Sequence, residues 1–308
     1  MTTQTSPADD AARHIHELFK SAWTLAAVSA YITDGHLDDP QGRVLGAAGL
    51  AVHEESGWHP SPELAALLDR PGGGASLQLA ANLRQMAAAG SGVSRWETEE
   101  IAPVEVRMAA ASQGVEFLVA NLVPLFPDLA ERFAGPESGI LDTRTGTGEV
   151  LAAYCVHFPG MRAIGYDLDE RNVKIANATL QAAGVADRAT VIHGDVSQLD
   201  ELDSFDSVRM PSTLTAPEVM CAALPRILRA LRPGGWLTVQ APAYDGDELS
   251  NAIARWRVIR DGGTPDTPSE IAEELRTIGY TDVHQVTPPF PLPLAMIAAR
   301  RPQDPHPV

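Results

Sequence analysis

The pattern of the chain changes near residue 136, and this change restricts the possible folds more than any other feature. After it, short β-rich runs alternate with helical stretches. This alternation predicts βαβ units, in which parallel strands form one sheet and helices cover both faces. We therefore predict an α/β domain with a doubly wound sheet over residues 136–308. Before it, Ala and Leu recur at helical spacing, which predicts a mainly helical domain over residues 1–135.

The expected elements follow from apolar runs and turn residues. Expected strands are 139–142, 162–166, 189–193, 204–210 and 236–240, with two closing strands in "TDVHQVTP" and "PLAMIAARR". Expected helices of this domain are 148–158, 170–183, 216–231, 246–260 and 268–278. The N-terminal domain is expected to hold helices at 8–33, 62–69, 76–89 and 101–134, with a small β-hairpin around a turn at 54–57.

Charge and composition exclude several classes of partner. The 308 residues carry a formal charge of -17, which repels nucleic acid and anionic membranes unless a basic patch overrides it. The best basic cluster, Arg226, Arg229 and Arg232, reads as the solvated face of one helix. No apolar run reaches the roughly 18 residues of a membrane span. We therefore expect a protein that binds neither nucleic acid nor membrane.

The first residues and the two cysteines indicate in which cellular compartment we expect the protein. The first residues, "MTTQTSPADDAARH", are polar and acidic, unlike a signal peptide. Cys155 and Cys221 both lie in apolar helical patterns, so we expect reduced core thiols rather than a disulfide. These features favour a cytoplasmic protein.

The stretch "GILDTRTGTGEV", residues 139–150, predicts a buried strand, a turn with two glycines and the start of a helix. This geometry presents backbone N–H groups to a polar ligand, and glycine allows close approach and positive φ. About 20 residues on, "GYDLD" places Asp167 at the end of the next strand, where a carboxylate can accept both hydroxyls of a ribose. Asp195 in "HGDVSQL" and the strand end "VRMP" reach the same edge of the sheet.

Taken together, five motifs resemble those of class I S-adenosylmethionine-dependent methyltransferases. They are "ILDTRTGTGEVL", "IGYDLDERNVKIA", "VIHGDV", "FDSVRMP" and "ALRPGGWLTV". The resemblance covers about residues 136–301 and implies a Rossmann-like sheet of seven strands with a reversed final hairpin. It also implies S-adenosylmethionine as cofactor and S-adenosylhomocysteine as product.

The resemblance assigns roles to residues at matching positions. Asp142, Thr143, Gly146 and Gly148 would line the methionine part of the cofactor, and Asp167 would hold the ribose. Leu168, Asp195 and Val196 would contact the adenine, and Arg209, Met210 and Pro211 would close the cofactor against the substrate.

The N-terminal domain more faintly resembles the shortened helical, winged-helix-like region of bacterial small-molecule O-methyltransferases. The likeness lies in "LAAVSAYITDG" and "AAGLAVHEESGWHPSPELAALL". It implies a homodimer whose N-terminal helices cover the substrate pocket. A winged helix can also read DNA, but the acidic charge opposes that alternative.

Arg144 stands where the family pattern has its first glycine. Three interpretations remain open at this stage. The guanidinium turns away and the backbone path survives, provided that φ stays negative. Alternatively, Arg144 pairs with a ligand carboxylate or with Asp142, or the cofactor site is damaged.

The residues give only weak candidates for catalysis. The loop after the fifth strand, "APAYDGDELS", lacks the His base of related O-methyltransferases and offers Tyr244, Asp245 and Asp247. These residues also suit a loop or a helix N-cap. His14 on the first helix is a further candidate, as are Trp23 and Tyr31 for an aromatic substrate pocket. No metal-binding spacing of His and Cys occurs.

The favoured function is methyl transfer from S-adenosylmethionine to a small aromatic or polyketide-like acceptor of secondary metabolism, by positioning and desolvation. The alternative is a non-methylating dimer of the same fold that binds cofactor or ligand as a scaffold or promotes another reaction. A nicotinamide-dependent oxidoreductase fits less well, because Leu151 stands where its glycine pattern needs Gly. Neither the acceptor nor the choice of O, N or C methylation follows from the sequence.

Overall fold

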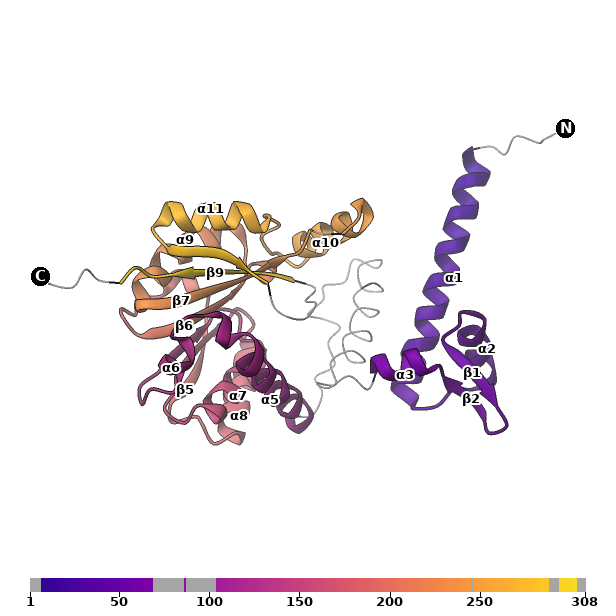
Figure 1. Cartoon of the computed structure of the whole chain (residues 1–308), viewed down its shortest axis with the longest axis horizontal. Helices are drawn as coiled ribbons and strands as arrows, with labels where there is room; N and C mark the ends of the chain where they lie inside the picture. The colour runs from indigo at the N-terminus through magenta and orange to yellow at the C-terminus, as the bar shows by residue number, and fades with distance from the viewer. Residues whose placement is uncertain (1–6, 69–85, 87–103, 245, 288–293, 304–308) are drawn as a thin grey trace, which may run out of the picture. The chain divides into compact units, whose positions relative to one another are not determined.

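A computed structural model describes residues 7–68, 86, 104–244, 246–287 and 294–303 (Figure 1). The chain divides into two compact units, Met1–Ile101 and Ala102–Val308. The second unit therefore begins well before the expected boundary at residue 136. The reason is packing: Val115, Leu122 and Phe133 are buried in the core against the sheet, so their segment folds with the second unit.

The first unit joins helices to one small hairpin. Its elements are α1 (Pro7–Asp34), α2 (Asp39–Ala47), β1 (Ala51–Glu54), β2 (Gly57–Pro60) and α3 (Pro62–Leu68). The antiparallel β1–β2 pair confirms the expected hairpin, whereas α2 was not expected. Asp38 caps α2 in a capping box with Gln41. Trp58 lies so close to α2 that a Cβ at Gly42 would be 2.0 Å from its ring, which explains the glycine there.

The second unit contains one seven-stranded sheet. Its order is β5-β4-β3-β6-β7-β9-β8. The strands are β3 (Gly139–Asp142), β4 (Arg162–Asp167), β5 (Ala189–His193), β6 (Phe205–Pro211), β7 (Leu231–Pro242), β8 (Thr281–Val286) and β9 (Leu294–Arg300). All pairs are parallel except those of β9 with β7 and β8. The α/β class, the doubly wound sheet and the reversed final hairpin are thus confirmed.

Helices cover both faces of this sheet (Figure 1). The first core contains side chains from α5 (Val104–Asn121), α6 (Leu129–Phe133), α7 (Glu149–His157) and α8 (Glu170–Ala182). The second core contains side chains from α9 (Pro217–Ala230) and α11 (Pro268–Ile278). The remaining helices are α10 (Glu248–Arg260) and the short η2 (Val123–Leu125), η3 (Val196–Gln198) and η4 (Ser212–Leu214).

Several expected elements differ in detail. The helix expected over 101–134 is divided, because Pro124 follows α5 and begins η2. The helix expected over 76–89 falls almost wholly on residues outside the described ones. Cys155 is a buried free thiol, as expected, but Cys221 is exposed. Its helix α9 is amphipathic, and Cys221 lies on the outer face.

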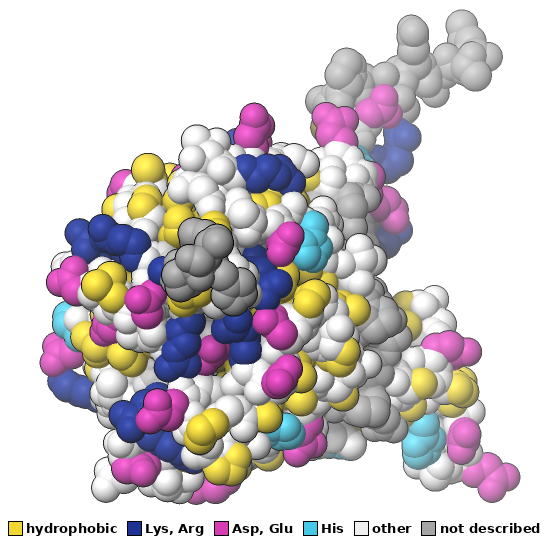
Figure 2. All heavy atoms as spheres, turned by 60° about the vertical axis from the view of Figure 1, so that its left-hand side comes forward, with side chains coloured by type: hydrophobic (Ala, Val, Ile, Leu, Met, Phe, Trp, Pro, Cys, Tyr) yellow, Lys and Arg dark blue, Asp and Glu magenta, His cyan; other side chains and the backbone are white. Residues whose placement is uncertain are grey.

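The expected basic helix face is also wrong in part. Arg232 belongs to β7 and pairs with Asp206, which is 4% exposed. Arg132 also pairs with Asp206, and Gly139 donates its N–H to it at 2.9 Å. Figure 2 shows the side of the molecule from which the C-terminus leaves, where Lys and Arg side chains alternate with Asp and Glu. The arginines of this network are paired with acids rather than gathered into a free basic patch.

One stretch of the described residues, Arg107–Leu125, is long and apolar enough to cross a membrane by length and composition alone. The expectation that no stretch reaches this length is wrong by that criterion. The stretch nevertheless contains Glu116 and Pro124, and its Val115 and Leu122 are buried in the core of the second unit. A core helix passes the same test, so this is weak evidence for a membrane span.

Candidate functional site

The turn after β3 is held against its two neighbouring strands. Thr143 donates its N–H to the carbonyl of Arg209 at 3.1 Å, and Thr145 donates to Tyr166 at 2.9 Å. Gly146 and Gly148 have φ of 61° and 87°, values that favour glycine. A Cβ on Gly148 would also lie 2.9 Å from Cα of Ala176 in α8. Both glycines are therefore required by the path of the turn and the packing of α7 on α8.

Asp167 ties the end of β4 to this turn. Its Oδ2 accepts the N–H of Gly146 at 2.9 Å, and its Oδ1 accepts the N–H of Asp169 at 2.9 Å. The amide of Asn172 lies 3.3 Å from Oδ1. A carboxylate offers about four acceptor positions, so Asp167 retains capacity for a ligand hydroxyl. Its side chain is buried at the carboxyl edge of the sheet, where the sequence places a ribose contact.

Arg144 combines parts of the interpretations left open by the sequence. Its φ is not positive, so the turn keeps its path without the first glycine. The guanidinium does not turn away: it lines a cavity near Asp167 and Asp195. Burial lowers the pKa of Arg144, and the charges of the two carboxylates oppose this shift. The only group of Arg144 that Asp142 accepts is the backbone N–H, at 3.3 Å. The Arg144 guanidinium is not a partner of Asp142.

This cavity has a volume of about 160 Å³ and lies beside the turn. The predicted residues that line it are Thr143, Arg144, Leu168, Asp195 and Val196. Asp195 caps η3 by accepting the N–H of Ser197 at 2.7 Å. We call this space the turn cavity.

Two polar atoms support the turn cavity as a ligand site. Thr143 Oγ1 and Arg144 Nη1 are buried and have no hydrogen-bond partner among the described residues. Buried polar atoms normally have a hydrogen-bond partner, and a bound ligand could provide one for each of these two atoms. Beside them lie the Asp167 carboxylate and the half-exposed, apolar Leu168. These residues fit a nucleoside with a polar tail, as the sequence predicts.

An ion pair closes the adjoining edge of the sheet. Arg209 on β6 donates from Nη1 to Oδ2 of Asp142 on β3 at 2.8 Å. The neighbouring Met210 is fully buried in the core on the opposite face, so its side chain cannot reach a ligand. Pro211 is half-buried at the end of β6. Of these three predicted residues, Arg209 is the one whose side chain reaches Asp142 beside the turn, although it does not line the turn cavity.

The weak catalytic candidates are not gathered at the turn. Tyr244 donates its hydroxyl to the carbonyl of Pro265 at 2.9 Å, and burial raises its pKa. Asp247 caps α10 by accepting the N–H of Ser250 at 2.9 Å, the N-cap alternative considered above. Asp245 lies outside the described residues. Tyr244 and Asp247 thus have structural partners of their own.

The candidates of the first unit lie on α1. His14 is exposed, Trp23 is 72% exposed and Tyr31 is half-buried. Trp23 therefore does not belong to the core of its unit. Their roles in catalysis or substrate binding stay predictions.

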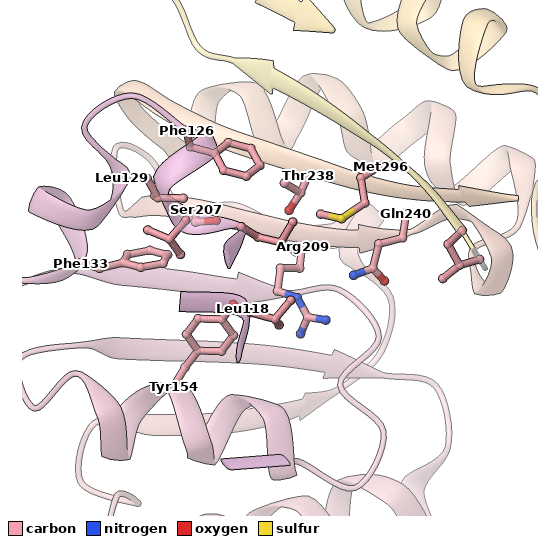
Figure 3. Close-up of a pocket in the computed structure, with 13 residues that line it drawn as sticks. Leu118, Phe126, Leu129, Phe133, Tyr154, Ser207, Arg209, Thr238, Gln240 and Met296 are labelled. Atoms are coloured by element: carbon pink, nitrogen blue, oxygen red, sulfur yellow. The ribbon is translucent and has the colours of Figure 1, made fainter. Parts of the chain in front are cut away.

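A second cavity, of about 150 Å³, was not expected from the sequence (Figure 3). It lies between the sheet and the segment that contains α5, η2 and α6. Its lining residues are Leu118, Leu122, Val123, Phe126, Leu129, Phe133, Tyr154, Ser207, Arg209, Thr238, Gln240, Leu294 and Met296. The sequence held one signal: polar residues alternate along two strands that should be buried, in "SVR" and "TVQ". We call this space the sheet cavity.

The comparisons with known proteins address the same region. A model of a methyltransferase domain matches residues 140–235, which contain β3 to the start of β7. The chain carries a class I methyltransferase domain. S-adenosylmethionine, the expected cofactor, is the methyl donor of this family of domains, so the sequence assignment of family and cofactor is confirmed.

Curated relatives are similar to part of the chain. Carboxy-S-adenosyl-L-methionine synthase of Vibrio parahaemolyticus is 28% identical over 138 residues, which are 44% of this chain and 56% of that protein. Ribosomal protein L11 methyltransferase of Desulforamulus reducens is 34% identical over 102 residues, 33% of this chain and 31% of that protein. The chain thus spans about half or less of the length of these relatives.

Solved structures are similar over nearly the whole chain. Human N-acetylserotonin methyltransferase in complex with SAM has a TM-score of 0.64 at 15% identity, covering 98% of this chain and 100% of its own. The methyltransferase SibL in its apo form has a TM-score of 0.61 at 16% identity, covering 94% and 99%. PigF with SAH has a TM-score of 0.58 at 16% identity, covering 97% and 100%. At these identities the likeness shows the fold, including a helical N-terminal region.

Proposed function

We propose that this protein transfers the methyl group of S-adenosylmethionine to a small aromatic or polyketide-like acceptor. One observation carries the proposal: Thr143 and Arg144 line the turn cavity, and their Oγ1 and Nη1 atoms are buried without a partner among the described residues, with the buried Asp167 carboxylate near Arg144. The similarity to small-molecule methyltransferases such as human N-acetylserotonin methyltransferase supports the acceptor class. The role in secondary metabolism that the sequence favours is part of the same proposal.

The proposed cofactor contacts come from three strand ends. Asp167 would accept the ribose hydroxyls, Leu168 and Val196 would enclose the adenine, and Asp195 would accept from its amino group. The glycine turn would hold the methionine part with backbone N–H groups. When bound, S-adenosylmethionine supplies an electrophilic methyl group on a sulfonium sulfur.

The chain's own residues contribute positioning and exclusion of water. Methyl transfer is an in-line displacement, so alignment of the acceptor atom with the sulfonium carbon accounts for much of the rate. Tyr244 and Asp247 have structural partners, and neither is set up as a general base. We therefore propose an acceptor that loses its proton more readily than an aliphatic alcohol and needs no strong dedicated base, such as a phenol or enol.

Labelled S-adenosylmethionine tests the proposal. Purified protein is incubated with the labelled cofactor and a panel of phenols and enolised polyketides, and the label in the organic extract is measured. We expect transfer to at least one acceptor, and loss of transfer in Asp167→Ala. Cofactor binding without transfer to any acceptor would instead support a non-methylating scaffold.

Three further expectations belong to the same proposal. The N-terminal unit would form a homodimer, the chain would act in the cytoplasm, and neither nucleic acid nor membrane would be a partner. The charge of -17 and the pairing of Arg132, Arg232 and Arg300 with acids support the absence of a nucleic-acid surface. Mass measurement in solution tests the dimer.

A further inference from the structure

The side of the sheet cavity that β6 and β7 form, which we call its floor, is unusual because it is polar. Central strands of a parallel sheet are covered on both faces and are normally apolar throughout. Here, Ser207 and Arg209 on β6 and Thr238 and Gln240 on β7 all face the cavity (Figure 3). Polar groups in such a place are costly unless they are satisfied by partners.

Most of these polar groups have unused hydrogen-bonding capacity. Thr238 donates to the carbonyl of Val208 at 3.2 Å, but no side-chain hydrogen bond of Ser207 or Gln240 is found among the described residues. Arg209 uses Nη1 toward Asp142 and has four further N–H donors in its guanidinium. The floor therefore offers several hydrogen bonds to a molecule in the cavity.

Tyr154 gives an independent indication of a ligand. Its side chain is 6% exposed and lines the cavity from α7. Its ring contacts Phe133 and Phe158, yet its hydroxyl has no hydrogen-bond partner among the described residues. Burial raises the pKa of Tyr154, so the hydroxyl keeps its proton at neutral pH and can donate it. A buried Tyr hydroxyl normally has a partner, and here the cavity is where that partner would lie.

The walls and the size of the cavity define the kind of molecule. Phe126 and Phe133 provide aromatic walls, and Leu118 and Met296 provide aliphatic ones. Apolar cavities of about 150 Å³ hold benzene. One ring fits, and its oxygen substituents would meet the donors of the floor.

The polar end of this cavity is next to the glycine turn. Arg209 pairs with Oδ2 of Asp142, and Oδ1 of the same carboxylate accepts the N–H of Arg144 in the turn. A ring whose oxygen contacts Arg209 would thus lie beside the carboxylate that joins β6 to the turn.

We propose that the sheet cavity binds a single aromatic ring bearing oxygen, such as a phenol, with its oxygen directed at Arg209. That the sheet cavity is also the binding site of the methyl acceptor rests on the function proposed above. Arg209 and Tyr154 would then select for an oxygen-bearing ring. The positive charge of Arg209 would favour the ionised form of a bound phenol.

Fluorine NMR titration tests the binding step without the cofactor. The probes are 4-fluorophenol and fluorobenzene, which differ by one hydroxyl. We expect saturable binding of 4-fluorophenol to the full chain, with fluorobenzene bound about tenfold more weakly because it leaves the floor donors unpaired. Absence of saturable 4-fluorophenol binding to folded protein at about 1 mM, or equal binding of both probes, would overturn the proposal.

A pair of Tyr→Phe variants separates binding from folding. In Tyr154→Phe, we expect affinity for 4-fluorophenol to fall about fivefold, the value of one hydrogen bond. Its Tm should not fall, because the lost hydroxyl had no protein partner. The matched control is Tyr280→Phe, since Tyr280 donates to Leu224 at 2.9 Å in the opposite core. The control should lose Tm and keep probe affinity; equal affinities of the two variants would overturn the assignment of Tyr154.

Titration with S-adenosylmethionine distinguishes this proposal from the proposed function. Protein that binds 4-fluorophenol but not the cofactor would contradict methyl transfer and leave the ring site in place. Protein that binds the cofactor but not 4-fluorophenol would contradict the ring site alone.

Discussion

Arg209 Nη1 lies 2.8 Å from Asp142 Oδ2, and this ion pair joins the carboxyl ends of β6 and β3. The two strands are neighbours at the point where the crossovers of the sheet change direction. Ligands of doubly wound sheets bind at this switch point. The pair has the turn cavity's glycine turn on one side and the sheet cavity on the other. The two cavities therefore adjoin one ion pair, as the proposed cofactor and acceptor sites require.

Asp167 is expected to bind the ribose. Replacing Asp167 with Ala should weaken S-adenosylmethionine binding by about 1.5–3 kcal/mol, the value of hydrogen bonds to a charged group. Calorimetric titration measures the change. Asp169, two residues on, is a matched control because it caps α8 by accepting the N–H of Arg171 at 2.8 Å. Asp169→Ala should cost about 1 kcal/mol of folding stability and leave cofactor affinity unchanged. Equal affinity losses in both variants would place the ribose elsewhere.

Arg144 is expected to contact the bound cofactor. Its guanidinium lies near Asp167 and Asp195, and one buried nitrogen has no partner among the described residues. Arg144→Ala should lower the affinity for S-adenosylmethionine about tenfold, because the ligand loses a hydrogen bond to a charged group. Lys at the same position is the control that keeps the charge. A rise in affinity on replacement with Ala would show that the guanidinium instead occupies space that the ligand needs.

Asp206 should be important for stability, although it lines neither cavity. It is 4% exposed and accepts from Gly139, Arg132 and Arg232. Asp206→Ala leaves the N–H of Gly139 without its acceptor and removes an acidic partner of Arg132 and Arg232, so it should destabilise the second unit by about 2–3 kcal/mol. Urea unfolding measures this loss. The exposed pair of Asp200 with Arg226 is the control, where Asp200→Ala should cost less than about 1 kcal/mol. Similar losses of folding stability in Asp206→Ala and Asp200→Ala would contradict the claim that burial makes the Asp206 interactions stronger.

The two cysteines should differ in reactivity. Burial raises the pKa of Cys155 to about 11, whereas Cys221 is exposed. Only the thiolate reacts quickly, so a thiol reagent at pH 8 should modify Cys221 in native protein and both cysteines after unfolding. Modification of Cys155 in the folded state would contradict this expectation.

The same shift makes stability depend on pH. The thiol of an unfolded chain has a pKa of about 8.5, well below the pKa of Cys155 in the folded protein. Between these values the folded state binds more protons than the unfolded state, so this contribution to stability falls as pH rises from about 9 to 11. Urea titrations of Cys155→Ala should lack this component. An unchanged pH dependence in that variant would contradict the assignment.

Much of the fold follows from local sequence signals. Strands β3 and β5 have the predicted bounds because each is a short apolar run ended by Asp or Gly-Asp. Helix α2 has only nine residues and is not predicted from apolar spacing, although Asp38 and Gln41 form a capping box that marks its start.

The candidate site was only partly predictable. The glycines and Asp167 could be placed because their roles depend on backbone geometry at a strand end. The guanidinium of Arg144 could not, because Asp167 and Asp195, which attract it, are distant in sequence. The polar residues of the sheet cavity have a local signal in "SVR" and "TVQ", but the cavity itself depends on how α5 and α6 pack over β6 and β7, which is a tertiary property.

Calorimetric titration of the wild-type chain with S-adenosylmethionine and S-adenosylhomocysteine tests the central claim most directly. If the turn cavity is a cofactor site although Arg144 replaces the first glycine, both ligands should bind with dissociation constants on the order of micromolar. This corresponds to a binding free energy of about -8 kcal/mol. If folded protein binds neither ligand, Arg144 marks a site that no longer accepts this cofactor, and the methyl-transfer account is wrong.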